Sequence, residues 1–266
     1  MELIMLGTGN AMCTRCYNTC FFLRTPAGGL LVDGGGGNGI FRQLRRAHIA
    51  VEQLRHIFVT HCHVDHILGI VWLIRKISPL IHKGRFTPPL TIYCHDEAAH
   101  ALRMMCRMMM PEKIHSALDQ TVLLRELADG ESVVFDVMTL TAFDIHSTKI
   151  KQFGFRATLP DGQQLVCLGD EPCNPLCEPW VRNCDWLLCE AFCLHRDQRQ
   201  FNPYEKHHST ALDAGRVAQQ LQARNLVLYH TEDTHLATRR PDYTAEAAQH
   251  FTGHIHVPDD LETISL

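Results

Sequence analysis

The sequence predicts an α/β protein in which mixed β-sheets are covered by helices, folded as a single domain over residues 1–266. Short apolar runs alternate along the chain with segments of helical periodicity, which is the pattern of such folds. Hydrophobic residues make up 45% of the sequence and charged residues 20%, so a large core can be buried and global disorder is excluded. The sequence contains no internal repeat, low-complexity tract or strong linker, and we therefore expect one domain.

The N-terminal part predicts strands that end in glycine or polar residues. "LIMLGTG" is a short apolar run that meets a glycine turn. "FFLRTPAGGLLVDGGGG" indicates two strands joined by a Pro/Gly turn, the second ending at Asp33 and a run of glycines. "IFRQLRRA" has a helical pattern and "RHIFVT" that of a strand. "ILGIVWLIRKI" is apolar nearly all round, which favours a buried helix.

The remainder predicts a strand and a helix capped by Asp96, then a run of strands, then helices alternating with strands. The strand and helix are "PLTIYC" and "HDEAAHALRMMCRMMM". The run of strands comprises "SVVFDVMTLTAFDIH", "GFRATL", "QQLVCLGD" and "CDWLLCEAF". The last part comprises the helix "STALDAGRVAQQLQ", which begins with hydroxyl capping residues, then "NLVLYH", the short helix "TAEAAQHF" and the strand "IHVP". The Met-rich "MMCRMMM" is more typical of core filling than of a binding surface.

Composition narrows the classes of function and the compartment. The formal net charge of −4 gives no global electrostatic reason to expect polyanion binding. No apolar run approaches the length of about 18 residues that a membrane-spanning helix needs, and the N-terminus has the pattern of a strand, not of a signal peptide. The 12 cysteines are scattered, so we expect reduced thiols and a cytoplasmic protein. Cys13-x-x-Cys16 could bind zinc or carry out redox chemistry, but free side chains are the simpler interpretation, because no second such pair follows at zinc-ribbon spacing.

A cluster of potential metal ligands follows the strand "RHIFVT". His61 and His63 alternate in "THCHVDH" and can point the same way, while Asp65 and His66 lie where the next helix begins. Imidazole nitrogens and carboxylate oxygens at this spacing suit a borderline dication such as Zn²⁺. The alternative is a polar turn that is rich in histidine by coincidence.

The same residue types recur at the ends of later strands. His146 ends "FDIH", Asp170 ends "LVCLGD" and His230 ends "LVLYH". Each of them alone would more simply be a hydrogen-bonded loop residue. With the cluster they make seven potential ligands, enough for two metal ions that share one carboxylate and together clamp the oxygens of an ester.

These motifs resemble the metallo-β-lactamase superfamily, whose HxHxDH signature "THCHVDH" matches, and within it the ribonuclease Z group. Segments similar to that group are "LGTGNA", "LLVDGGGGNGIFRQL", "HSTKIKQFGFR", "DWLLCEAF" and "HHSTALDAGRVAQQLQARNLVLYH". The resemblance covers nearly the whole chain. It implies a four-layer αβ/βα sandwich of two mixed sheets with helices outside. Two departures are Gly36, where glutamate is usual, and Cys189, which replaces a histidine.

The resemblance also implies a role for each site residue and two Zn²⁺ per chain, with Mn²⁺ or Fe²⁺ as possible replacements. One ion would be held by His61, His63, His146 and Asp170, and the other by Asp65, His66, Asp170 and His230. Asp65 would orient the attacking water and accept its proton. His208, paired with Glu190, would donate a proton to the leaving alkoxide. Asp33 would hold a ligand or the loop backbone. The alternative for Glu190 and His208 is a buried pair with a structural role.

The substrate is less closely defined. Transfer-RNA-processing ribonuclease Z carries a long arm between the third histidine ligand and the bridging aspartate, whereas here "GFRATLPDGQQLVCLGD" runs straight through a hairpin. We therefore predict a dizinc phosphodiesterase of the short form that lacks the arm, acting on a small phosphodiester or on RNA. The segment between His66 and His146 could supply a grip on RNA.

Two other functions are compatible with the sequence. One is another hydrolase of this fold, acting on a thioester, lactone or sulfate ester. The other is a non-catalytic binding protein, which missing ligands would favour, but none is missing. The resemblance further implies a possible homodimer, and no membrane partner is expected.

Overall fold

The computed structural model describes residues 1–26, 28–87 and 89–266, and the chain forms two compact units. The first unit comprises Met1–Gly7, Tyr17–Ala128 and Asp260–Leu266, and the second comprises Thr8–Cys16 and Asp129–Asp259. The Pro/Gly turn predicted between the first two strands of the hairpin includes Ala27, which lies outside the described residues. The single domain over residues 1–266 stays a prediction.

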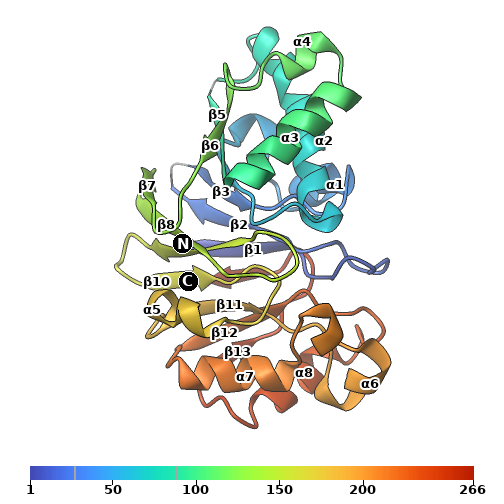
Figure 1. The fold of residues 1–266 in the computed structure, drawn as a ribbon, viewed down its shortest axis with the longest axis vertical. Helices are drawn as coiled ribbons and strands as arrows, with labels where there is room; N and C mark the ends of the chain where they lie inside the picture. Colours follow the sequence, from blue (N-terminus) through green and yellow to red (C-terminus); the bar gives the residue numbers. More distant parts are fainter. Residues whose placement is uncertain (27, 88) are drawn as a thin grey trace. The chain divides into compact units, whose positions relative to one another are not determined.

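The first unit contains a mixed sheet in which, over the described residues, seven strands have the order β14-β1-β2-β3-β4-β5-β6 (Figure 1). The strands are β1 (Glu2–Gly7), β2 (Cys20–Thr25), β3 (Gly28–Val32), β4 (His56–Phe58), β5 (Leu90–Cys94), β6 (Val122–Glu126) and β14 (Thr263–Ser265). Neighbours from β3 to β6 are parallel, and those from β14 to β3 are antiparallel. The carboxyl ends of β3, β4 and β5 therefore meet at one edge of the sheet. The strands β6 and β14 were not predicted.

Helices pack against this sheet through a continuous core. They are α1 (Gly39–Arg46), the short 3-10 helix η1 (Val51–Gln53), α2 (Val64–His82), α3 (Asp96–Met109) and α4 (Glu112–His115). The buried face of α2 includes Ile70, Ile74 and Ile77, each fully inaccessible and part of the same core as Leu102 of α3. Burial of an isoleucine or leucine side chain contributes about 1.5–3 kcal/mol, so this core fixes α2 on the sheet. The buried helix was predicted, but it begins earlier, at Val64.

Two details of α3 correct the sequence analysis. The capping residue is His95, whose ring nitrogen accepts a hydrogen bond from the Ala98 backbone N–H at 3.3 Å, while Asp96 is the first helical residue. The Met-rich segment at the end of α3 is not all core: Met108 is 79% exposed and Met109 64%. Helical periodicity explains this, because consecutive residues of a helix point in different directions and cannot all face the sheet.

The second unit contains a further mixed sheet, with the order β13-β12-β11-β10-β9-β8-β7 over the described residues (Figure 1). The strands are β7 (Ser132–Phe135), β8 (Met138–Asp144), β9 (Phe153–Thr158), β10 (Gln164–Cys167), β11 (Trp186–Glu190), β12 (Asn225–Tyr229) and β13 (His254–His256). Strands β10 to β13 are parallel and β7 to β10 antiparallel. The single strand predicted for "SVVFDVMTLTAFDIH" is two strands, because Asp136 adopts a left-handed conformation (φ 52°) and turns the chain.

The helices of the second unit are short except for two. These two are α7 (Ala211–Gln220) and α8 (Arg239–Ala247); the others are η2 (Pro175–Cys177), α5 (Glu178–Val181), η3 (His195–Asp197), α6 (Gln198–Phe201) and η4 (Tyr204–Lys206). The predicted hydroxyl cap of α7 is Thr210, which forms a reciprocal capping box with Asp213. Ala214, Ala218 and Ala247 bury the facing sides of α7 and α8 in the core of this unit. Within the described parts of the chain, none of the helices is both long enough and apolar enough to cross a membrane.

Candidate metal and active site

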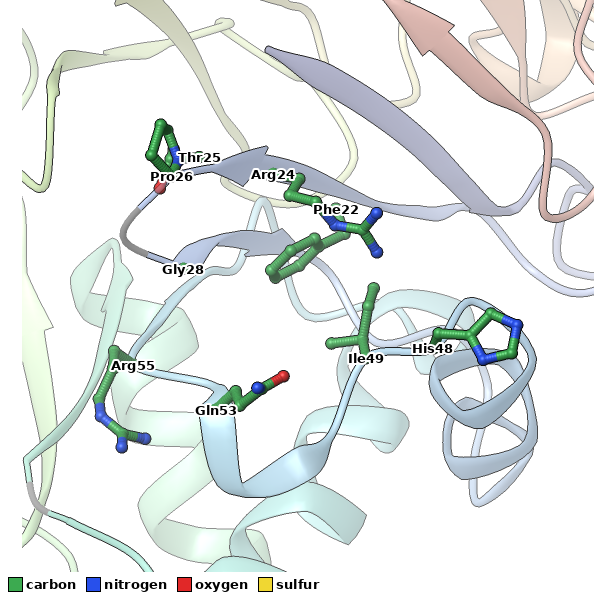
Figure 2. Close-up of a pocket in the computed structure, with 9 residues that line it drawn as sticks. All are labelled: Phe22, Arg24, Thr25, Pro26, Gly28, His48, Ile49, Gln53 and Arg55. Carbon is green, nitrogen blue, oxygen red and sulfur yellow. The ribbon is translucent and has the colours of Figure 1, made fainter.

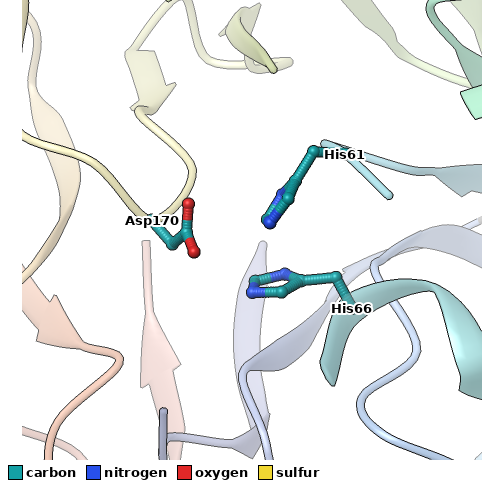
Figure 3. Close-up of side chains that lie close together, drawn as sticks. All are labelled: His61, His66 and Asp170. Carbon is teal, nitrogen blue, oxygen red and sulfur yellow. The ribbon is translucent and has the colours of Figure 1, made fainter. Parts of the chain in front are cut away.

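The first group of predicted ligands lies in the loop after β4 and the first turn of α2. His61 Nε2 is 2.8 Å from His63 Nδ1. The rings of His61 and His66, both drawn in Figure 3, have centroids 4.2 Å apart. Asp65 Oδ2 lies 3.5 Å from His66 Nε2. Three of the four residues, His61, Asp65 and His66, are buried. The loop therefore brings the nitrogen and oxygen atoms of "HCHVDH" together, and their role as metal ligands stays a prediction.

Asp33 holds this group from the end of the neighbouring strand β3. Its carboxylate accepts hydrogen bonds from the Thr60 backbone N–H at 2.8 Å and the Thr60 hydroxyl at 2.7 Å, and lies 2.7 Å from His66 Nδ1. A carboxylate at Nδ1 keeps the proton on that nitrogen and leaves Nε2 of His66 as the atom that could bind a metal. Thr60 was not predicted as a site residue, and nothing in its local sequence separates it from an ordinary loop threonine.

A close backbone contact places the start of α2. The position that a β-carbon on Gly69 would occupy is 1.9 Å from the Gly34 carbonyl oxygen. The backbone N–H of Gly34 donates to the carbonyl of His66, and that of Gly69 to the carbonyl of Gly35, both at 2.9 Å. The glycine run after Asp33 is therefore a surface on which α2 rests, and it sets where Asp65 and His66 begin the helix.

The second group of predicted residues lies at one edge of the other sheet. Asp170 follows β10, Glu190 is the last residue of β11, and His230 follows β12. Because these strands are parallel, their carboxyl ends lie side by side, which is where open α/β sheets place ligands. One potential ligand atom from each of Asp170, His208 and His230 lies within 4.8 Å of the others. Asp170 is also drawn in Figure 3, on the loop after β10.

Two residues that the sequence analysis missed hold the Asp170 loop. The amide oxygen of Gln152, a fully buried residue, accepts a hydrogen bond from the Asp170 backbone N–H at 3.1 Å. The hydroxyl of Tyr229 donates to the carbonyl of Gly169. A buried polar side chain needs a hydrogen-bond partner. Gln152 directly before the apolar "FGF" was therefore a signal that could have been used, although the sequence could not name its partner.

Glu190 and His208 are close together, but each makes its hydrogen bonds elsewhere. His208 Nδ1 is 2.8 Å from the Asp170 carbonyl oxygen and 3.8 Å from Glu190 Oε2. The two Glu190 oxygens accept from the backbone N–H groups of Ser209 at 2.5 Å and Phe192 at 3.0 Å. Glu190 therefore fixes the backbone on both sides of the loop that carries His208.

Burial shifts the pKa values of both residues towards their neutral forms. The pKa of His208 falls to about 3, mainly through burial and then through the nearby charge of His230. Burial likewise raises the pKa of Glu190 well above its ordinary value. Phe192 contributes to the enclosure, because its ring stacks on that of His208 at 4.7 Å. His208 in this environment is a neutral imidazole at neutral pH.

His146 is placed differently from the other residues of the second group. It follows β8, adopts a left-handed conformation (φ 57°) and is exposed. Its backbone N–H donates to Asp144 Oδ1 at 2.7 Å. The compact ligand groups found within the described residues do not include His146. Its role as a ligand stays a prediction.

The chemistry of both donor sets fits a metal ion such as zinc. Each set combines imidazole nitrogens with carboxylate oxygens, which are zinc ligands in hydrolytic sites. In each set a scaffold made by other elements positions the ligands: Asp33 and the glycine run in the first unit, Gln152 and Tyr229 in the second. This agreement supports a metal site, and leaves the identity and number of the ions open to measurement.

A pocket of about 360 Å³ lies elsewhere in the first unit, beside the turn after β2 (Figure 2). Its lining includes Phe22, Arg24, His48, Ile49 and Arg55, and none of the predicted site residues. Both guanidinium groups already have partners: Arg24 Nη1 binds Glu2 at 3.0 Å, and Arg55 Nη1 donates to the Glu52 carbonyl at 2.8 Å. The pocket therefore has no part in the predicted chemistry.

Comparisons with known proteins agree with this fold and with the sequence motifs. The chain is 29% identical to the ribonuclease Z of Streptomyces coelicolor over 99% of its own length and 97% of that protein. It superposes on the Bacillus subtilis metallo-β-lactamase fold protein YhfI with a TM-score of 0.79 at 19% identity, covering 99% of this chain and 98% of that one. For the short form of human tRNase Z (ELAC1) the TM-score is 0.74 at 24% identity, covering 100% and 99% of the two chains. These likenesses confirm the α/β fold and its two mixed sheets with helices.

The chain is thus a ribonuclease Z-like protein of the metallo-β-lactamase superfamily, and these relatives support a metal-dependent hydrolase. The family model described as Anti-Pycsar protein Apyc1 matches residues 1–252, and the chain belongs to this family. It is also 30% identical to the uncharacterized protein ML1173 of Mycobacterium leprae, over 92% of this chain and 81% of that protein. Between His146 and Asp170 the chain forms only the hairpin of β9 and β10, so the arm of the transfer-RNA-processing enzymes has no counterpart in this segment.

Proposed function

We propose that this protein is a metal-dependent phosphodiesterase that binds two zinc ions per chain. The ligands are His61, His63, Asp65, His66, His146, Asp170 and His230, assigned by the match to the family motif. The observation that carries the proposal is the scaffolded set Asp170, His208 and His230, in which a family ligand pair and the expected acid lie within 4.8 Å of one another. A thioester, lactone or sulfate ester would need the metal ligands but has less need of an acid such as His208.

When bound, the metal ions supply positive charge that activates water at neutral pH and neutralises phosphate oxygens. Asp65, beside His66, orients the attacking water and accepts its proton at a carboxylate oxygen. His208 donates a proton to the leaving alkoxide. Its lowered pKa means that the imidazole takes up a proton only when a negative charge is close, and a bound phosphodiester provides that charge. Glu190 keeps the His208 loop in place through the backbone of Ser209 and Phe192.

An ester panel tests the reaction class. The purified protein is assayed with bis-p-nitrophenyl phosphate, an aryl sulfate and an aliphatic thioester, with and without a chelator. We expect chelator-sensitive turnover of the phosphodiester, abolished in Asp65→Ala and reduced about 10²-fold or more in His208→Ala. The matched control is His207→Ala, which removes the exposed neighbouring histidine and should leave turnover within a factor of two to three. If the protein hydrolysed the thioester or the aryl sulfate, and His208→Ala did so as fast as the wild type, one of the alternative hydrolase functions would be correct instead.

The substrate is a small phosphodiester or RNA, and a transfer-RNA precursor with a 3′ trailer separates the two. Relatives named ribonuclease Z favour RNA, whereas the missing arm and the net charge of −4 favour a smaller substrate. We expect weak or no cleavage of the precursor at concentrations where bis-p-nitrophenyl phosphate turns over. Robust cutting at the 3′ trailer would assign RNA instead. Elemental analysis of the same preparation measures which metal is bound and whether there are two ions per chain. A cytoplasmic location and a homodimer stay predictions.

A further inference from the structure

The pair of cysteines noted in the sequence lies on the loop between β1 and β2 that belongs to the second unit. Cys13 and Cys16 are both partly exposed, and their thiols are hydrogen-bonded to each other. Gly9 makes room for them. The position that a β-carbon on Gly9 would occupy is 2.6 Å from Cys16 Sγ and 3.0 Å from Cys13 Sγ. Two accessible thiols side by side can form a disulfide with little movement of the chain.

The described surroundings of the pair argue against a metal site. Within residues 1–26, 28–87 and 89–266, the groups of three or more histidine, cysteine or carboxylate side chains that could hold an ion include neither Cys13 nor Cys16. The nearby carboxylate of Asp233 already accepts hydrogen bonds from the backbone N–H groups of Thr14 and Arg15, each at 2.8 Å. Structural zinc needs four ligands, and two thiols do not supply them.

The loop that carries the pair is attached to the segment directly after His230. Cys13 Sγ donates a hydrogen bond to the Thr231 carbonyl oxygen at 3.1 Å, and the Asn10 backbone N–H donates to the same oxygen at 2.9 Å. The Thr231 backbone N–H in turn donates to the Thr8 carbonyl at 3.0 Å. His230 itself has a left-handed backbone (φ 58°), a conformation that surrounding contacts must hold. The thiol of Cys13 is one of these contacts.

We propose that Cys13 and Cys16 form a reversible disulfide, and that its formation loosens the segment carrying His230. A low-molecular-weight disulfide such as oxidised glutathione is the oxidant. One cysteine sulfur attacks it and releases the first glutathione thiol, and the second cysteine sulfur then displaces the other. The two cysteine thiols lose two protons and two electrons in total, which end on two molecules of reduced glutathione. The Cys13 sulfur then has no hydrogen to donate, so the bond to the Thr231 carbonyl is lost.

The disulfide itself is tested by mass spectrometry of the full-length, metal-loaded protein. The protein is incubated with oxidised glutathione, its remaining thiols are alkylated, and it is digested with trypsin without reduction. Trypsin cuts after Arg15, between the two cysteines, so the disulfide joins the peptide ending at Arg15 to the peptide beginning at Cys16. We expect this joined species, about 2 Da lighter than its two reduced parts, and its disappearance with dithiothreitol. Because the peptide that begins at Cys16 also contains Cys20, fragment ions should place the link at Cys16 and the alkyl group at Cys20. Glutathione held separately on either cysteine, or a link from Cys13 to the buried Cys20, would overturn the proposal.

The effect on His230 rests on the proposed function and has its own readout, the dissociation constant of zinc measured by competition with a chelator. We expect oxidation of the wild type to raise this constant about fivefold, the effect of losing one hydrogen bond. Cys13→Ser keeps a donor for the Thr231 carbonyl and cannot be oxidised, so its constant should not respond to oxidised glutathione. Cys13→Ala lacks the donor and should resemble the oxidised wild type without any oxidant. The coupling to His230 would be overturned if the wild type formed the joined peptide but neither oxidation nor either substitution changed the dissociation constant of zinc. Zinc binding that responds as expected, without turnover of any phosphodiester, would contradict the proposed function and leave the disulfide standing.

Discussion

At the scale of single residues, the structure shows which groups are contacted by side chains whose function the sequence could only suggest. Asp33 is the example in the first unit. It lies 27 positions before Thr60 in the chain, yet its carboxylate binds both the backbone and the hydroxyl of that residue. The same carboxylate faces His66 Nδ1 at 2.7 Å. One acidic side chain therefore orients both the loop and a predicted ligand.

Asp33→Asn tests this role. Asparagine tolerates the left-handed conformation of residue 33 (φ 58°), so the backbone can stay, but its amide does not select the His66 tautomer as a carboxylate does. We expect the dissociation constant for zinc to rise about 10–100-fold, measured by chelator competition. Asp136→Asn is the matched control, because Asp136 is exposed and also left-handed (φ 52°). Equal zinc binding by Asp33→Asn and the wild type would show that the carboxylate does not support the ligand.

His208 predicts a pH dependence of stability. Its pKa in the folded chain is about 3, below the ordinary value of 6.5, so the unfolded chain takes up the proton first. Stability is therefore full above pH 6.5 and decreases as the pH falls from 6.5 towards 3. Between pH 7.5 and 5 this single group should lower the free energy of unfolding by roughly 2 kcal/mol.

The measurement is urea unfolding of the metal-free protein at both pH values. His208→Gln should remove most of this difference, while His207→Gln, at the exposed neighbour, should keep it. Glu190, whose pKa burial raises, favours the opposite trend, but it is present in every variant and drops out of the comparison. An identical pH dependence in His208→Gln and the wild type would contradict a buried, neutral His208.

At the scale of elements, the site depends on where helices and strands begin and end. The start of α2 is fixed by the glycine run after β3, against which Gly69 packs at backbone distance. The hydrogen bonds between Gly34 and His66, and between Gly69 and Gly35, tie the two segments together. Asp65 and His66 lie in the first turn of this helix, so the contact places two predicted ligands.

Gly69→Ala makes the contact measurable because its two effects have opposite signs. In an open helix the replacement stabilises by about 1 kcal/mol. Here the new methyl group would lie 1.9 Å from the Gly34 carbonyl oxygen, so the helix must shift. We expect a loss of stability of about 2 kcal/mol or more in urea unfolding, together with weaker zinc binding. A stabilised variant would mean that α2 does not rest on the glycine run.

At the scale of the whole molecule, the proposed ligands come from elements far apart in the sequence, so bound metal should stabilise the folded chain against unfolding. A ligand present at about 100 times its dissociation constant stabilises the native state by about 2.7 kcal/mol. Chelation should therefore lower the midpoint of thermal unfolding by roughly 5–10 °C, and added zinc should restore it. The double variant His61→Ala/His63→Ala is the control: it lacks two ligands of one proposed ion and should respond to both treatments less than the wild type does. If the chelator left the midpoint of thermal unfolding of the wild type unchanged, the proposal of a resident metal would be contradicted.

Much of this molecule was predictable because the relevant signals are local. Periodicity and turn residues predicted the helix α2, the hydroxyl cap of α7 and the strands that lie directly before Asp170 and His230. The predictions failed where residues near in sequence point in different directions. Asp136 splits a run of strand-forming residues into two strands, and the exposed Met108 lies two positions from the buried Cys106 on the same helix.

The sequence alone determined which ligand types occur, that they stand at strand ends, and which superfamily the chain belongs to. Only the tertiary structure decided which side chains hold them. In the structure, His66 Nδ1 contacts the Asp33 carboxylate, and the Asp170 backbone N–H donates to Gln152. The Nδ1 atom of His208 contacts the Asp170 carbonyl, while Glu190 accepts from backbone N–H groups nearby. The physical reason is that the residue type of a potential ligand can be read from a single sequence position. Its hydrogen-bond partner depends on which strands, distant in sequence, pair with each other. Such pairing depends on the packed core, which no local pattern encodes.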